Sequence, residues 1–145
     1  MNKFAIALGA LGLFVGASLT EASAGGSRVV IDQYGRGNAA AAAQNGNGNF
    51  ARLWQKGKYN SVQSEQYGNG NTTVLGQQGK FNYAYSYQGG TNNLIGVAQM
   101  GKGNNAVATQ SGRNNVSATI QVGNGLEAET NQHGKGNTAV VIQGN

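Results

Sequence analysis

Residues 60–70 read NSVQSEQYGNG, and residues 71–81 read NTTVLGQQGKF. The two stretches share their first asparagine, their glutamine and the glycine two places after that glutamine. The same spacing continues in both directions along the chain. The sequence is therefore an array of short equivalent units, and such a repeat is the strongest single guide to the architecture.

Three residue types keep this phase. Glutamine recurs at every eleventh position, at Gln33, Gln44, Gln55, Gln66, Gln77, Gln88, Gln99, Gln110, Gln121, Gln132 and Gln143. Glycine follows two positions later, at Gly35, Gly46, Gly57, Gly68, Gly79, Gly90, Gly101, Gly112, Gly123 and Gly134. Asparagine follows five positions after the glutamine, at Asn38, Asn49, Asn60, Asn71, Asn82, Asn93, Asn104, Asn115 and Asn137, and Leu126 replaces it once.

Each unit reads as one strand and one turn. Alternate residues of a strand face opposite sides, so Asn60, Val62, Ser64 and Gln66 share a face. The four residues 67–70 fit a tight turn, because glycine and asparagine tolerate the positive φ angles that such turns require. We therefore expect an all-β chain of seven-residue strands and four-residue turns.

Side-chain size indicates that two units form one coil. The position two residues before the glutamine alternates between larger and smaller side chains, which are Ile31, Leu53, Leu75, Val97, Thr119 and Val141 in one series and Ala42, Ser64, Ser86, Ala108 and Thr130 in the other. Two facing sheets pack closely when one wall is large and the other small. The sequence predicts a β-solenoid of about five 22-residue coils, stacked about 4.8 Å apart in a cross-β arrangement.

Glutamine and asparagine on the inner face would stack in register. A buried amide without partners costs roughly 1–3 kcal/mol, whereas stacked amides can bond to the coils above and below. We expect an inward ladder at the glutamine positions and another at the asparagine positions, with the glycines in the turns.

The first 24 residues differ from the array. Lys3 precedes an apolar run, and Ala22-Ser23-Ala24 forms an A-x-A cleavage site. This pattern predicts a helical secretory signal peptide over residues 1–24, a short lead-in with the first strand over 25–32, and the repeat array over 33–145. The apolar run is shorter than the ~20 residues that span a bilayer, and no later stretch could span one.

The units resemble the curlin repeat of bacterial curli amyloid fibres, Q-x-G-x-x-N-x-A-x-x-x-Q, as in residues 33–44 and, for its first part, 99–106. The resemblance covers residues 33–143. It implies a secreted subunit that polymerises into adhesive, biofilm-forming fibres at the bacterial surface. It also implies periplasmic chaperones, an outer-membrane export pore and a nucleator subunit as partners. The regular last repeat, residues 137–143, favours the major subunit over the nucleator.

The ends of the array predict how subunits join. The last strand, Thr138, Ala139, Val140, Val141, Ile142 and Gln143, is uncharged and rich in β-branched residues. Open strand edges of this composition pair with other chains, and a head-to-tail contact that does not close makes a filament. A soluble β-solenoid that binds a surface is the alternative function.

Charged residues are few, but four basic ones recur at a regular spacing. The net charge is +5, and Arg36, Lys58, Lys80 and Lys102 occupy one equivalent turn position. Stacked coils would align them as a basic ridge that attracts polyanions or a host surface, or that simply keeps the turns solvated. Glu127 and Glu129 lie on an outward face without a cleft.

The residue types indicate no enzyme. Cysteine and proline are absent and there is a single histidine, His133. No metal-ligand cluster, activated nucleophile or phosphate-binding loop is apparent, so no cofactor is expected.

Overall fold

A computed structural model describes residues 18–145, and every regular element in that range is a strand. The strands are β1 (Ser18–Ala24), β2 (Ser27–Arg36), β3 (Ala39–Asn45), β4 (Phe50–Lys58), β5 (Ser61–Asn69), β6 (Thr72–Lys80), β7 (Tyr83–Thr91), β8 (Leu94–Lys102), β9 (Asn105–Arg113), β10 (Val116–Asn124), β11 (Glu127–Lys135) and β12 (Thr138–Gly144).

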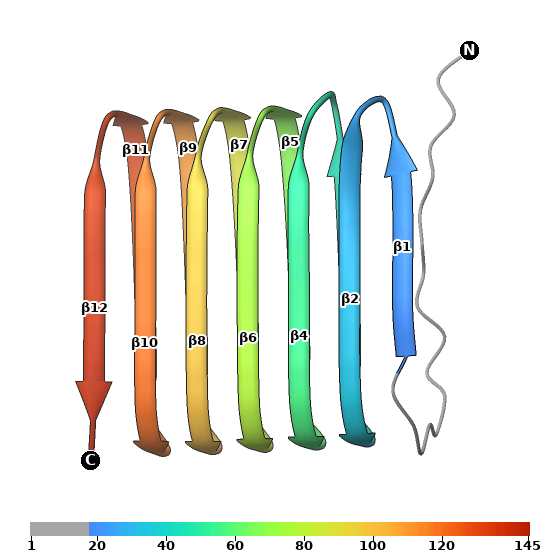
Figure 1. Cartoon of the computed structure of the whole chain (residues 1–145). Coiled ribbons are helices and arrows are strands. Elements are labelled where there is room, and N and C mark those ends of the chain that lie inside the picture. The colour runs from blue at the N-terminus through green and yellow to red at the C-terminus, as the bar shows by residue number, and fades with distance from the viewer. Residues whose placement is uncertain (1–17) are drawn as a thin grey trace.

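Two sheets face each other across the molecule (Figure 1). The first sheet has the order β1-β2-β4-β6-β8-β10-β12, and the second has the order β11-β9-β7-β5-β3. From β2 onward the chain alternates between the sheets, so two successive strands make one coil. The all-β solenoid predicted from the repeat is confirmed.

Successive coils are stacked in register, with each strand beside the equivalent strand of the next coil. Leu53 pairs with Leu75, which pairs with Val97, and every pair of solenoid strands within a sheet is parallel. Parallel pairing of equivalent residues brings similar side chains above one another, and this confirms the 22-residue coil as the structural period.

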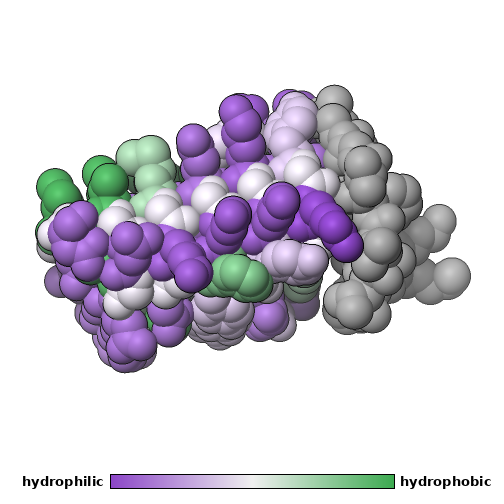
Figure 2. Space-filling view, turned by 90° about the horizontal axis from the view of Figure 1, so that it is seen from below, coloured by the Kyte–Doolittle hydropathy of each residue, from purple (hydrophilic) through white to green (hydrophobic). Residues whose placement is uncertain are grey.

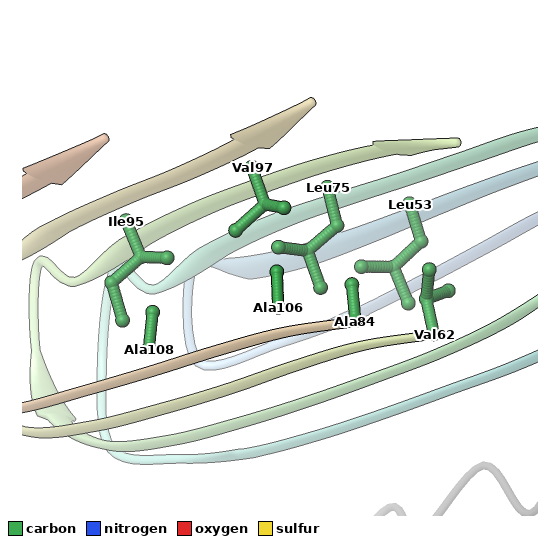
Figure 3. Close-up of a cluster of buried hydrophobic side chains, with 8 residues drawn as sticks. All are labelled: Leu53, Val62, Leu75, Ala84, Ile95, Val97, Ala106 and Ala108. Carbon is green, nitrogen blue, oxygen red and sulfur yellow. The ribbon is translucent and has the colours of Figure 1, made fainter. Parts of the chain in front are cut away.

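The core lies between the sheets and follows the predicted difference in size. Leu53, Leu75, Ile95 and Val97 extend from the first sheet, and they pack against a group of mostly small side chains from the second (Figure 3). That second group is Val62, Ala84, Ala106 and Ala108. Burial of each large side chain contributes roughly 1.5–3 kcal/mol. The whole cluster lies within residues 53–108, so a chain that begins at Gly25 keeps its core.

The core becomes polar toward the C-terminus. Ser117 and Thr119 are buried at the positions that Ile95 and Val97 occupy one coil earlier, and Thr130 is buried at the position of Ala108. The hydroxyls of Ser117 and Thr130 satisfy each other across the sheets at 2.8 Å. The last coils therefore bury less apolar surface than the central ones.

The strands are longer than the seven residues predicted from the repeat. β5 extends for nine residues to Asn69, two residues beyond Tyr67, where the turn was expected to begin. The expected extent of the turn was wrong because coil-to-coil pairing continues through the glycine, as Gly68 to Gly90 and Asn69 to Thr91. A bend that is stacked on an identical bend keeps its ladder bonds.

The end of the expected signal peptide is also a strand. β1 covers seven of those residues and pairs antiparallel with β2, from Ser18 opposite Gln33 to Ala24 opposite Ser27. A helix was expected over residues 1–24, and residues 18–24 do not form one; residues 1–17 lie outside the described range. A search of the described residues finds no helix with the length and apolar character to span a membrane.

Candidate functional site

The glutamines form two continuous ladders inside the solenoid. Each Nε2 donates to the Oε1 of the equivalent glutamine in the next coil, over 2.6–3.3 Å. One ladder links Gln33, Gln55, Gln77, Gln99, Gln121 and Gln143, and the other links Gln44, Gln66, Gln88, Gln110 and Gln132. All of these bonds point the same way, so the ladders are polar.

The glutamines also tie the two sheets together. Gln77 Nε2 donates to the carbonyl oxygen of Ser61 in the second sheet at 3.0 Å, and Gln88 Nε2 donates to the carbonyl of Thr72 in the first at 2.9 Å. Both side chains are fully buried. Each glutamine therefore satisfies its amide in two directions, along the stack and across the coil.

The asparagines hold the bends mainly through backbone groups. The Oδ1 of Asn71 accepts the backbone N–H of Asn93 at 3.1 Å, and its Nδ2 donates to the carbonyl of Gly90 at 3.0 Å. Direct amide-to-amide bonds occur at 3.2 Å between Asn60 and Asn38 and at two other places. The expected amide ladder therefore differs from the glutamine one, because the shorter asparagine side chain reaches the backbone of the next bend first.

Leu126 interrupts this pattern on one side only. Its backbone N–H still donates to Asn104 Oδ1 at 3.0 Å, because that bond uses the main chain and not the side chain. The leucine side chain has no oxygen and no N–H, so it cannot bond to a following coil as asparagine does. The asparagine bonds that are missing at position 126 therefore lie at the C-terminal end of the stack.

The glycines sit where a side chain would strike the next coil. Gly79 has φ +126°, and a Cβ built on it would overlap the carbonyl oxygen of Gly101. Equivalent glycines from Gly35 to Gly112 meet the next coil's glycine in the same way. Only glycine permits both this backbone conformation and this separation of coils.

The two ends of the stack are complementary. At the N-terminal end Gln33 and Gln44 receive no ladder bond, and at the C-terminal end Gln132 and Gln143 donate none onward, within residues 18–145. In that range β12 pairs only with β10 and β11 only with β9. The side chain of Ile142 is 72% exposed and that of Val140 60%.

Four basic turn residues occupy paired positions on successive coils. Arg36 pairs with Lys58, Lys58 with Lys80, and Lys80 with Lys102 in the ladder, and all four are exposed. These four residues are called the basic ridge. The first-sheet strands from β2 onward end at the bottom of Figure 1, and Figure 2 views the molecule from that side, where many of the residues are hydrophilic. Like charges at this spacing create a strong local positive potential.

Two aromatic residues were not recognised from the sequence as an ordered feature. Tyr59 and Phe81 occupy the turn position that is otherwise glycine or asparagine, with φ +57° and +59°. Their rings stack at 5.4 Å with an interplanar angle of 9°. The signal was available, because both residues lie four places after a repeat glutamine. Their stacking offsets the strain of bulky residues at positive φ.

The outer face of the second sheet carries tyrosines and glutamates. Burial raises the pKa of Tyr85, and the negative charge of Glu65 beside it raises the pKa further. Among the described residues no group of three or more His, Cys, Asp or Glu side chains could hold a metal ion. The ordered chemistry of this molecule lies in its stacked amides and its ends.

Comparison with known proteins gives one match. The family model of the curlin associated repeat matches residues 27–57, 68–101 and 90–121, which together exceed half of the chain. No curated protein and no solved structure matches the chain at a significant level. The chain therefore belongs to the curlin family, whose repeats point to a subunit of a curli fibre.

Proposed function

We propose that the chain polymerises head to tail into an extracellular cross-β fibre that serves in adhesion and in the biofilm matrix. The polarity of the glutamine ladders carries this proposal. Gln132 and Gln143 donate from Nε2 across the coil but have no acceptor along the stack at one end, and they match Oε1 groups of Gln33 and Gln44 that receive no ladder bond at the other. A second subunit on the stack supplies the partners that each end lacks, and a buried amide left without them costs roughly 1–3 kcal/mol.

The backbone supports the same contact. β11 and β12 present open edges at one end, and β3 presents an open edge at the other. Unprotected edges pair readily with another chain, and the uncharged composition of β12 favours such pairing. Each added subunit creates a new open edge of the same kind, so growth continues.

Strand β1 can explain why fibres would grow only after export. Its seven residues cover the free edge of β2. Cleavage after Ala24 removes β1 and opens that edge. We infer that β1 closes the β2 edge of the first sheet in the precursor. In the secreted chain, which starts at Gly25, that edge is open. Passage through the periplasm and an outer-membrane pore, with chaperones and a nucleator as partners, is part of this proposal and rests on the family.

The first test is assembly of the chain from Gly25 to Asn145 at neutral pH. We expect fibres with a reflection at about 4.7–4.8 Å along the axis and another at about 10 Å across it. Fibres that grow without a second protein would mean that the subunit can nucleate itself, and fibres that grow only from added seeds would mean that it needs a separate nucleator. A folded chain that remains monomeric would instead support the soluble surface-binding solenoid.

Two double variants test whether β12 forms the contact between successive subunits. Val140→Lys/Ile142→Lys places two charges on the end strand, and we expect elongation from seeds to slow by about tenfold. The matched control is Leu94→Lys/Ile120→Lys, which adds the same charges to the same outer face on interior strands. Equal elongation rates in the two variants would remove β12 from the growing contact.

The basic ridge supports a second role. Its four cations are aligned on successive coils and exposed, and the ion pair of Asp32 is made with Arg52, outside the ridge. A fibre would repeat the ridge in every subunit. We propose that these ridges hold polyanions such as extracellular DNA or acidic polysaccharide.

A further inference from the structure

We propose that the outer face of β8, β10 and β12 is the surface through which filaments of this chain pack side by side. This apolar face is defined by the outward residues of those three strands. Its large side chains are exposed, and they are Leu94, Met100, Ile120, Val122, Val140 and Ile142. No charged residue occurs in residues 94–101, 114–126 or 136–145. The inference rests on the proposed polymer, because a single subunit does not present enough of this face.

The apolar residues form one continuous surface. Ala98, Ile120 and Ile142 are ladder neighbours, as are Met100 and Val122. Small residues between them, such as Gly96 and Ala118, keep the surface flat. A flat face of this kind suits sheet-on-sheet packing, in which two faces approach to about 10 Å.

The remaining outer surface also exposes large side chains, such as Tyr67, Val74 and Tyr83, but charged residues lie among them. On the same sheet, the strands nearer the N-terminus carry Arg52 and Lys56 outward, both exposed. On the opposite sheet the outward positions include Glu65, Glu127 and Glu129. In Figure 2 several strongly hydrophobic residues lie together at the end of the molecule farthest from the grey residues, and another lies near the middle of the view. Contiguous exposed apolar patches on a folded chain mark contact surfaces.

The area identifies the partner as a second filament of the same chain. Strands of about seven residues, three of them side by side, give a face of roughly 20 by 14 Å, or about 300 Å². A stable protein interface buries about 800 Å² on each side, so two subunits do not hold together through this face alone. A filament repeats the face in every subunit, and the buried area then grows with filament length.

A second copy also matches the chemistry. Apart from Lys102, the last residue of β8 at the margin of the face, the face carries no charge, so two copies are complementary to each other without burying an ionic group. The face reaches β12, the strand at which the next subunit docks in the proposed polymer. Every subunit of a filament therefore presents it, and a filament of the same chain presents it at the same intervals.

The experiment compares filament growth with filament bundling in the chain from Gly25 to Asn145. Leu94→Lys/Ile120→Lys places two charges on the apolar face. The matched control, Val107→Lys/Thr109→Lys, places two charges on the outer face of β9 in the opposite sheet. Growth is followed by seeded elongation, and bundling is measured by electron microscopy as the share of filament length that runs beside another filament.

We expect bundling to fall at least about fivefold in Leu94→Lys/Ile120→Lys, with elongation within about twofold of the unsubstituted chain and of the control. The unsubstituted subunit before assembly should sediment as a monomer. Bundling that persists in the substituted filaments, or that falls equally in the control, would overturn the assignment of this face.

A milder variant covers the case in which the lysines prevent growth. Met100→Gln keeps the side-chain length and Ile120→Thr keeps the β-branched shape that strands favour, and unchanged bundling in filaments of this double variant would equally overturn the proposal. Single filaments of the unsubstituted chain that coat lipid vesicles would show that the face binds a membrane and not a second copy. Absence of any elongation is a different result, because it removes the polymer itself.

Discussion

At the residue scale, the repeat glycines are held by two constraints at once. A side chain on Gly79 would meet the carbonyl of Gly101, and its φ of +126° is unfavourable for any residue with a Cβ. We expect Gly79→Ala to lower the free energy of unfolding by more than about 3 kcal/mol, measured by denaturant titration of the subunit before assembly. Gly96→Ala is the control, since Gly96 has no atom within 4 Å of its added Cβ, and we expect it to be neutral.

The buried glutamines offer an equally sharp comparison between neighbours. Gln77→Leu removes a bond to Ser61 and leaves Gln99 Oε1 without its donor. We expect a loss of about 2–4 kcal/mol in the free energy of unfolding. Gln78→Leu, one residue along and exposed, should change it by less than about 0.5 kcal/mol. Similar losses at the two positions would mean that the ladder contributes little.

The placement of a side chain could be predicted wherever the repeat is strict. The inward direction of the glutamines and the large and small walls followed from spacing alone, because a 22-residue coil leaves one position for each. The bonding of the asparagines did not follow, since it depends on whether an amide reaches a neighbouring amide or a backbone group. Nor did the stacking of Tyr59 on Phe81, which occurs once in the described residues.

At the element scale, the basic ridge is a property of the turns after the strands of the first sheet. Lys58→Gln/Lys80→Gln removes two of its four cations. We expect weaker binding of fibres to duplex DNA, and a plot of log affinity against log salt whose slope falls by about 2. Arg113→Gln/Lys135→Gln removes two cations from the turns at the opposite edge and serves as the control. Equal changes in slope would mean that net charge, and not the ridge, attracts the polyanion.

The boundaries of the elements were less predictable than their existence. Glycine and asparagine indicate a turn, but stacking lets pairing continue through the bend, so the strands are longer than local sequence suggests. The apolar face was missed for a related reason. Its residues recur at the 22-residue spacing only over the last coils, as in Ile120 and Ile142 or Met100 and Val122, and earlier coils carry polar or charged residues at some of these positions. The repeat as a whole therefore did not indicate the face.

At the scale of the whole molecule, the strands from β2 to β12 divide unequally, with six in the first sheet and five in the second. β12 therefore projects beyond β11 at one end, and β2 projects beyond β3 at the other. The projecting strand of one subunit fits the recessed sheet of the next only if the second subunit is turned by half a revolution about the fibre axis. The glutamine, glycine and asparagine positions permit this, since they are the same in both sheets.

An odd number of strands thus predicts a two-fold screw. Two subunits make one axial repeat of 11 strand spacings, about 53 Å, whereas stacking without rotation would leave a gap and repeat every six spacings, about 29 Å. Layer lines in electron micrographs of single fibres distinguish the two values. With the screw, the face of β8, β10 and β12 alternates between opposite flanks of the fibre. Each fibre then has two adhesive sides, and association through them builds flat rafts and not isolated pairs.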